Sequence, residues 1–179
     1  MADDVTSELR DLGFEHGLFN VSLEPCEPSP SGIDEIEFGF APNLGETMRP
    51  LRAIASSGEI SRVMLAIKTI LAGHDMIPIM VFDEIDANVG GETANAVGKK
   101  LATVADTHQV ICITHLPQVA VHGNNHFVVS KETVDSRTKT TISELTQKER
   151  TLEIARMLGG KDLTSVTMRH AEEMLKQNE

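Results

Sequence analysis

The pattern of apolar and polar positions predicts a chain in which strands alternate with helices. Residues 18–23 and 33–40 alternate apolar with polar side chains, as in two half-buried strands that pair antiparallel. Residues 79–82 and 109–114 are short apolar runs, which we interpret as buried strands of a parallel sheet. Between these runs, residues 92–105 place apolar side chains at helical spacing. The order strand, helix, strand therefore predicts a right-handed βαβ unit.

A further helix is predicted over residues 60–71, because apolar side chains recur there at helical spacing and the pattern stops at Gly73. Ser56, Ser57 and Gly58 lie where this helix begins. Backbone amides and the positive end of the helix dipole point outward at such a start, which suits a phosphate group. Taken alone, N-capping by Ser56 or Ser57 explains the same residues. These residues therefore indicate a nucleotide only if other motifs support them.

The remaining segments are predicted by the same rules. Prolines and Gly32 indicate a loop over residues 25–32. The other segments are a helix end over residues 5–12 that closes near Gly13, strands over residues 127–130 and 139–145 with a turn at residues 135–136, and helices over residues 148–158 and 164–176. His108 and the pair Lys99 and Lys100 are interpreted as surface residues.

Composition and charge narrow the classes of function. The chain has 179 residues, of which 40% are hydrophobic, and a formal net charge of −11. A nucleic-acid groove is usually basic, so this segment is not expected to supply most phosphate contacts if the protein works on DNA. No apolar run reaches the roughly 18 residues that a membrane span needs, and the acidic N-terminus lacks a signal-peptide core. We therefore expect a cytoplasmic chain with no membrane partner.

Carboxylates follow the apolar run at residues 79–82. Asp83 and Glu84 would lie at the carboxyl end of a parallel strand, which is where open α/β sheets bind ligands. An Asp at that place can hold magnesium, usually through water, and a following Glu can orient or deprotonate an attacking water. This is the Walker B pattern of a P-loop nucleotidase. A strand followed by a solvated acidic turn explains the same residues, and the motif alone does not decide between the two interpretations.

Three features now follow one another along the chain: a serine- and glycine-rich helix start, an acidic strand end, and a strand followed by His115. In this order they resemble the second half of an ABC-type ATPase head. The matching stretches are the signature motif at residues 55–59, Walker B with its catalytic glutamate at Asp83 and Glu84, the D-loop at residues 86–90, and the switch histidine at His115. Transporter heads usually continue with Pro-Thr after the glutamate, whereas Ile85 and Asp86 are similar to SMC-like heads.

Longer stretches are similar to the RecN family of bacterial DNA repair proteins, which are SMC-like ATPases. The stretches lie at residues 33–38, 42–43, 49–51, 82–86, 108–118 and 155–160. The resemblance implies that residues 17–179 form the C-terminal lobe of a P-loop ABC/SMC-type head. Its α/β fold would have a mostly parallel sheet flanked by helices and an antiparallel β element near the N-terminus. Residues 1–16 would be the end of a returning coiled-coil arm and its linker.

The resemblance also implies a function in DNA double-strand-break repair and recombination. In such proteins two heads sandwich two ATP molecules, and DNA is bound by the complete protein near the nucleoid. The signature residues Ser56, Ser57, Gly58 and Glu59 would contact the γ-phosphate of ATP held on the opposite head. The remaining assignments are Asp83 as the support of magnesium, Glu84 as the residue that polarises the attacking water, and His115 as the sensor of the γ-phosphate.

Two residues depart from the family pattern. Ser57 replaces the first glycine of the signature motif, so its side chain either crowds the phosphate or adds a hydroxyl donor. Gly90 replaces the D-loop aspartate of many SMC heads.

The Walker A pattern GxxxxGK[ST] is missing from the sequence, since Lys99 is followed by Lys100 and Lys161 by Asp162. A coiled-coil heptad segment is missing too. We therefore expect the chain to need an N-terminal Walker A lobe of the same head as a partner, and to be inactive alone. The alternative is a non-catalytic regulatory or dimerisation fragment of an SMC-like protein. A transporter ATPase half is a weaker third interpretation, because of Ile85 and Asp86.

Overall fold

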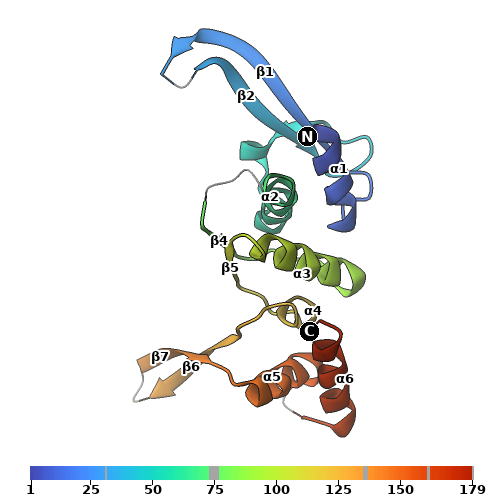
Figure 1. Ribbon diagram of the computed structural model, residues 1–179, viewed down its shortest axis with the longest axis vertical. Helices are drawn as coiled ribbons and strands as arrows, with labels where there is room; N and C mark the ends of the chain where they lie inside the picture. Colours follow the sequence, from blue (N-terminus) through green and yellow to red (C-terminus); the bar gives the residue numbers. More distant parts are fainter. Residues whose placement is uncertain (31, 73–76, 135–136, 161, 179) are drawn as a thin grey trace. The chain divides into compact units, whose positions relative to one another are not determined.

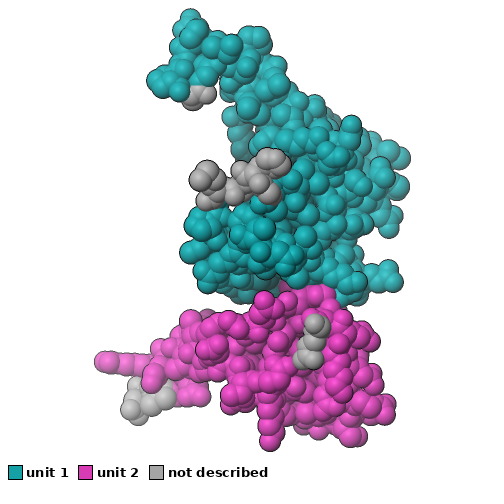
Figure 2. Space-filling model, in the orientation of Figure 1, with its two compact units in different colours: residues 1–114 teal, residues 115–179 magenta. Residues whose placement is uncertain are grey.

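The computed structural model describes residues 1–30, 32–72, 77–134, 137–160 and 162–178. The chain divides into two compact units, residues Met1–Thr114 and His115–Glu179, which Figure 2 shows in different colours. Each unit has its own helices and its own β-structure (Figure 1). Within the described ranges, no helix is long and apolar enough to cross a membrane.

A long antiparallel hairpin forms part of the first unit (Figure 1). Helix α1 (Ala2–Asp11) precedes strands β1 (Leu18–Ser29) and β2 (Gly32–Ala41), and the short strand β3 (Arg49–Pro50) pairs with β2. The predicted antiparallel pair is confirmed, but the predicted loop over residues 25–32 is wrong for most of its length. The reason is that β1 is the outer strand of its sheet, where prolines are tolerated.

Three helices pack together in the first unit. A 3₁₀ turn, η1 (Leu51–Ala53), leads to helix α2 (Ser57–Leu71), and helix α3 (Gly91–Ala105) follows later in the chain. Their fully buried side chains, with those of α1, form the core: Val5, Leu9, Val63, Leu65, Ala66, Ala94, Val97 and Val104. The predicted helices are confirmed, although the predicted end at Gly73 lies outside the described residues.

Two predicted surface residues are not on the surface. The Lys100 ammonium lies 2.6 Å from a Glu8 carboxylate oxygen and 2.9 Å from one of Asp11, so it ties α3 to α1. His108 is buried at the end of the connection from α3 to the next strand, where its Nδ1 lies 3.2 Å from the Val104 carbonyl oxygen. His108 is buried and Lys100 is half-buried, and each of these side chains has a polar partner on a neighbouring turn or helix.

The predicted βαβ unit is confirmed. Strands β4 (Ile79–Phe82) and β5 (Gln109–Cys112) are parallel neighbours with α3 between them in the chain. Burial alternates along β4, so only Met80 and Phe82 are buried, and the prediction of a strand buried on both faces is wrong. The other face carries apolar side chains that nothing in the described residues covers: Ile79, Val81, Ile111 and Ile113 are 50%, 64%, 46% and 57% exposed.

The second unit is a small α/β assembly of its own. It contains helix α4 (Pro117–Ala120), the antiparallel strands β6 (Phe127–Val134) and β7 (Arg137–Glu144), and helices α5 (Gln147–Gly159) and α6 (Ser165–Lys176). Its core consists of Val121, Ile154, Ala155, Ala171 and Leu175. Threonine caps begin both long helices, and the predicted stop at Gly160 is confirmed by its positive φ of 76°. The predicted turn at residues 135–136 lies outside the described residues.

Candidate functional site

The start of α2 carries the residues that are predicted to form a signature motif. Ser56 is the N-cap, and its Oγ accepts a hydrogen bond from the Glu59 backbone amide at 3.4 Å. Ser57 is the first helical residue and is exposed, whereas Gly58 is buried. The predicted helix start is therefore confirmed, with Ser56 rather than Ser57 as the cap. Apart from the Glu59 amide, the first-turn amides at this end have no partner within the helix, which leaves them suited to an anion.

The turn after β4 carries the acidic residues. Asp83 and Glu84 are both exposed at the carboxyl end of the strand, as predicted. The chain then reverses through the Ala87 amide, which donates to the Glu84 carbonyl at 3.0 Å. Glu84 and Asn88 have positive φ values of 56° and 60°, which side-chain-bearing residues rarely adopt. The Glu84 carboxylate is thus displayed by an unusual backbone conformation.

Helix α2 is fastened directly to this turn. Ser61 Oγ donates to the Asp83 carbonyl oxygen at 3.0 Å, one helical turn after the signature residues. The Arg62 guanidinium donates to the carbonyl oxygens of Ile85 at 3.3 Å and of Ala87 at 3.0 Å. Helix α2 and the turn after β4, which carry the residues predicted to form the signature and Walker B motifs, are therefore joined by hydrogen bonds into one piece.

Arg62 was not identified from the sequence, although it organises this piece. Its side chain is only 6% exposed, and its guanidinium carbon lies 5.0 Å from the centre of the Phe14 ring. Burial lowers the pKa of Arg62, while nearby Glu59 acts in the opposite direction. Arginine remains charged in proteins, so a cation is held against the turn by two carbonyls and an aromatic face. The available signal was its position four residues after Gly58, which puts both on one helix face.

A direct contact joins the signature motif to the catalytic glutamate candidate. The Ser57 hydroxyl donates a hydrogen bond to Glu84 Oε2. Both residues are exposed, so the contact lies at the surface of the first unit. The sequence left open whether Ser57 crowds a phosphate or adds a donor, and within this chain it acts as a donor.

The ends of the parallel strands β4 and β5 also meet. Thr114 Oγ1 donates to Asp86 Oδ2 at 2.5 Å, and Asp86 is buried in the D-loop stretch. Burial raises the pKa of the neighbouring Cys112 to about 12, so its thiol stays protonated and is a poor nucleophile. His115 is the first residue of the second unit and is exposed. Its role as the switch histidine therefore stays a prediction.

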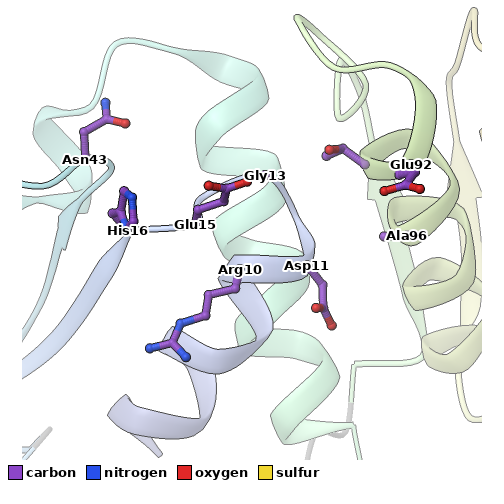
Figure 3. A pocket seen from close by; sticks show the side chains of 9 residues that line it. Arg10, Asp11, Gly13, Glu15, His16, Asn43, Glu92 and Ala96 are labelled. Carbon is purple, nitrogen blue, oxygen red and sulfur yellow. The ribbon is translucent and has the colours of Figure 1, made fainter.

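A separate hollow of about 560 Å³ lies elsewhere in the first unit. Arg10, Asp11, Glu15, His16 and Glu92 are among its lining residues, and Figure 3 shows that they come from α1, the loop after it and α3. The lining is mixed in charge and includes none of the signature or Walker B residues. Among the described residues, no three His, Cys, Asp or Glu side chains gather so as to hold a metal ion.

Comparison with known proteins finds relatives from several bacteria that all have the same name. No family model matches the chain. DNA repair protein RecN of Haemophilus influenzae is 42% identical over 177 residues, which is 98% of this chain and 32% of the relative. The chain belongs to the RecN family. RecN of Bacillus subtilis is 38% identical over 193 residues, and that of Deinococcus radiodurans is 42% identical over 176. The chain thus spans about a third of the length of the RecN relatives that it matches.

Solved structures give the fold of this RecN-family segment. An SMC head domain with coiled coil and joint from Pyrococcus yayanosii matches 96% of the chain and 28% of its own length, with a TM-score of 0.59 at 20% identity. A structure described under ATP-driven dimerization and DNA stimulated activation of SMC ATPases matches 90% of the chain and 92% of its own length, with a TM-score of 0.52. The expected α/β fold of an SMC-type head is therefore confirmed, but the expected mostly parallel sheet is not, because among the described strands only β4 and β5 pair in parallel.

The close packing around Gly58 can be tested directly. A Cβ added at Gly58 would lie 2.9 Å from Ala87 Cβ and 3.1 Å from the Glu84 carbonyl oxygen. Alanine is favoured over glycine in helices by up to about 1 kcal/mol, but overpacking against backbone costs roughly 1–3 kcal/mol. We therefore expect Gly58→Ala to lower the free energy of unfolding, measured by urea denaturation. The control is Gly90→Ala, where the new Cβ meets open space. Equal stability of the two variants would contradict the close approach.

Proposed function

We propose that this chain supplies the signature motif, Walker B and switch histidine of a RecN-type ATPase head that acts in DNA double-strand-break repair and recombination. The observation that carries the proposal is the hydrogen-bonded piece made by Ser61, Arg62 and the turn from Asp83 to Ala87. A helix start suited to phosphate and an acidic strand end are thereby held rigidly to each other. Catalysis of phosphoryl transfer is mainly positioning and charge stabilisation, so fixing these two groups within one head would fix the positions of the two ATP sites between paired heads.

The chemistry of each residue follows from its place. Ser56 and the amides at Gly58 would face the γ-phosphate of ATP on an opposite head, with Glu59 closing the first turn. Glu84 would accept a proton from the attacking water or orient it. His115 would contact the γ-phosphate from the following strand end.

Asp83 suits a magnesium ion. Its carboxylate is exposed at the strand end, and magnesium prefers oxygen ligands, often one or two carboxylates with phosphates and water. When bound, magnesium would neutralise charge on the ATP phosphates. The protein's own contribution is to hold Asp83 in place, which the Ser61 hydrogen bond to its carbonyl does.

An N-terminal Walker A lobe is the partner that the first unit needs. The outer face of β4 and β5 exposes four large aliphatic side chains, although parallel sheets are normally covered on both faces. The chain also covers only about a third of the RecN relatives. We infer that a Walker A lobe packs on this face and brings the phosphate-binding loop with it. Two such heads would then pair around ATP, and the complete protein would bind chromosomal DNA in the cytoplasm.

ATP hydrolysis by a reconstituted head tests the proposal. The chain is mixed with the N-terminal Walker A lobe of a RecN-family protein, and phosphate release is compared for the chain, the lobe and the mixture. We expect activity in the mixture only. The control replaces Val81 with Asp on the open face, which should abolish both the pairing and the activity. A folded complex that binds ATP without hydrolysing it would instead support a regulatory or dimerisation role.

A further inference from the structure

We propose that Ser57 is a positioning residue that couples the two nucleotide sites of paired heads. In one head its hydroxyl holds the Glu84 carboxylate. When that hydroxyl turns to the γ-phosphate of ATP on the opposite head, Glu84 is released for the nucleotide of its own head. The proposal rests on the proposed function, since it needs two heads and a catalytic Glu84.

Hydrogen bonds from other residues keep Ser57 close to Glu84. Ser57 donates to Glu84 Oε2, while Ser61 and Arg62 fasten the same helix to the same turn on the carbonyls of Asp83, Ile85 and Ala87. The backbones of Ser57 and Glu84 therefore stay close even if their side chains rotate. Because both side chains are exposed, each can turn to another partner without disturbing the core.

The Ser57 hydroxyl can donate to the Glu84 carboxylate or to the γ-phosphate, but not to both at once. A serine hydroxyl has one proton and can donate it to a single strong acceptor. A carboxylate and a phosphate are both charged acceptors of comparable strength, so an arriving γ-phosphate competes directly with Glu84. Ser56 differs, because its Oγ accepts the Glu59 amide as a cap and its proton stays free for phosphate. Glycine at position 57, as in the usual family pattern, could not make this exchange.

The first test asks whether Ser57 holds Glu84 in the chain of 179 residues. The probe is the carboxyl ¹³C resonance of Glu84, identified by its loss in Glu84→Gln. We expect Ser57→Ala and Ser57→Gly to shift this resonance and Ser57→Thr, which keeps the hydroxyl, to preserve it. Ser165→Ala is the matched control, because Ser165 is the exposed first residue of α6. An unmoved resonance in a folded Ala or Gly variant would overturn the proposal.

The second test measures coupling in the reconstituted head as rate against ATP concentration. The parent should show cooperative hydrolysis, with a Hill coefficient above 1. Ser57→Ala should bring the coefficient toward 1 and raise the rate at low ATP roughly threefold or more, because one hydrogen bond to a charged group no longer restrains Glu84. Ser57→Thr should restore the parental curve.

The outcomes separate the two proposals. Identical curves for the parent and Ser57→Ala would overturn the coupling while leaving the ATPase function intact. A parental mixture that forms a folded, ATP-bound complex without hydrolysis would overturn the proposed function, and the coupling with it, even if the carbon resonance showed the contact.

Discussion

Replacing Glu84 with Gln in the reconstituted head is expected to slow ATP hydrolysis by roughly 10²- to 10³-fold. General-base catalysis by a positioned side chain contributes about this factor. The substitution is nearly isosteric, and the remaining amide oxygen can still accept the hydrogen bond from Ser57. ATP-dependent pairing of heads should therefore persist, and the paired form should accumulate because hydrolysis no longer ends it. Phosphate release gives the rate, and size-exclusion chromatography with ATP gives the pairing.

The matched control for Glu84 is Glu92→Gln. Glu92 lies in the first turn of α3, is exposed and has no assigned role in the reaction. Its replacement removes the same charge from the same unit and should leave the rate unchanged. If Glu84→Gln hydrolysed ATP as fast as Glu92→Gln, the role assigned to Glu84 would be wrong.

Replacing Arg62 with Met is expected to destabilise the first unit by roughly 3 kcal/mol. Hydrogen bonds to a charged group contribute about 1.5–3 kcal/mol each, and their loss leaves the carbonyls of Ile85 and Ala87 without this donor. The cation–π contact with Phe14 is lost as well. Methionine retains an apolar stem of similar length, which limits the cavity. Urea unfolding of the 179-residue chain measures the change.

Arg52→Met is the control for Arg62. Arg52 is 78% exposed, and its guanidinium lies 2.6 Å from a Glu37 carboxylate oxygen. An exposed ion pair of this kind contributes less than about 1 kcal/mol. Equal unfolding midpoints for the two variants would mean that Arg62 does not hold the turn. A loss confined to Arg62→Met, together with lower activity in the reconstituted head, would link the stability of the turn to the chemistry.

The local pattern of apolar and polar residues was enough to predict the helices and strands of the site and their order along the chain. The helical spacing after Ser56, the apolar run before Asp83 and the strand before Thr114 each appear in the structure where the sequence places them. These features depend on residues near one another in the chain, so periodicity, capping and turn chemistry report them directly. The family resemblance then assigned roles to the same residues.

Contacts between distant segments could not be derived in the same way. Arg62 and Lys100 look like ordinary charged helix residues until the structure shows what each of them meets. The Ser57 contact with Glu84 joins residues 27 positions apart and depends on how α2 approaches the turn. The open face of β4 was missed for the opposite reason: its apolar run indicates burial, but none of the described residues covers that face.

The prolines of β1 have a consequence for the behaviour of the chain at high concentration. Pro25 and Pro28 lie in the outer strand of the hairpin sheet, and proline offers no amide hydrogen to a strand from another molecule. The hairpin edge therefore resists adding strands of a second copy. In the β4–β5 pair both strands are edges and neither contains proline. The β6–β7 pair shares both properties, so self-association of the chain should begin at these two pairs rather than at the hairpin, and a Walker A lobe that covers β4 and β5 would remove one of the two sites.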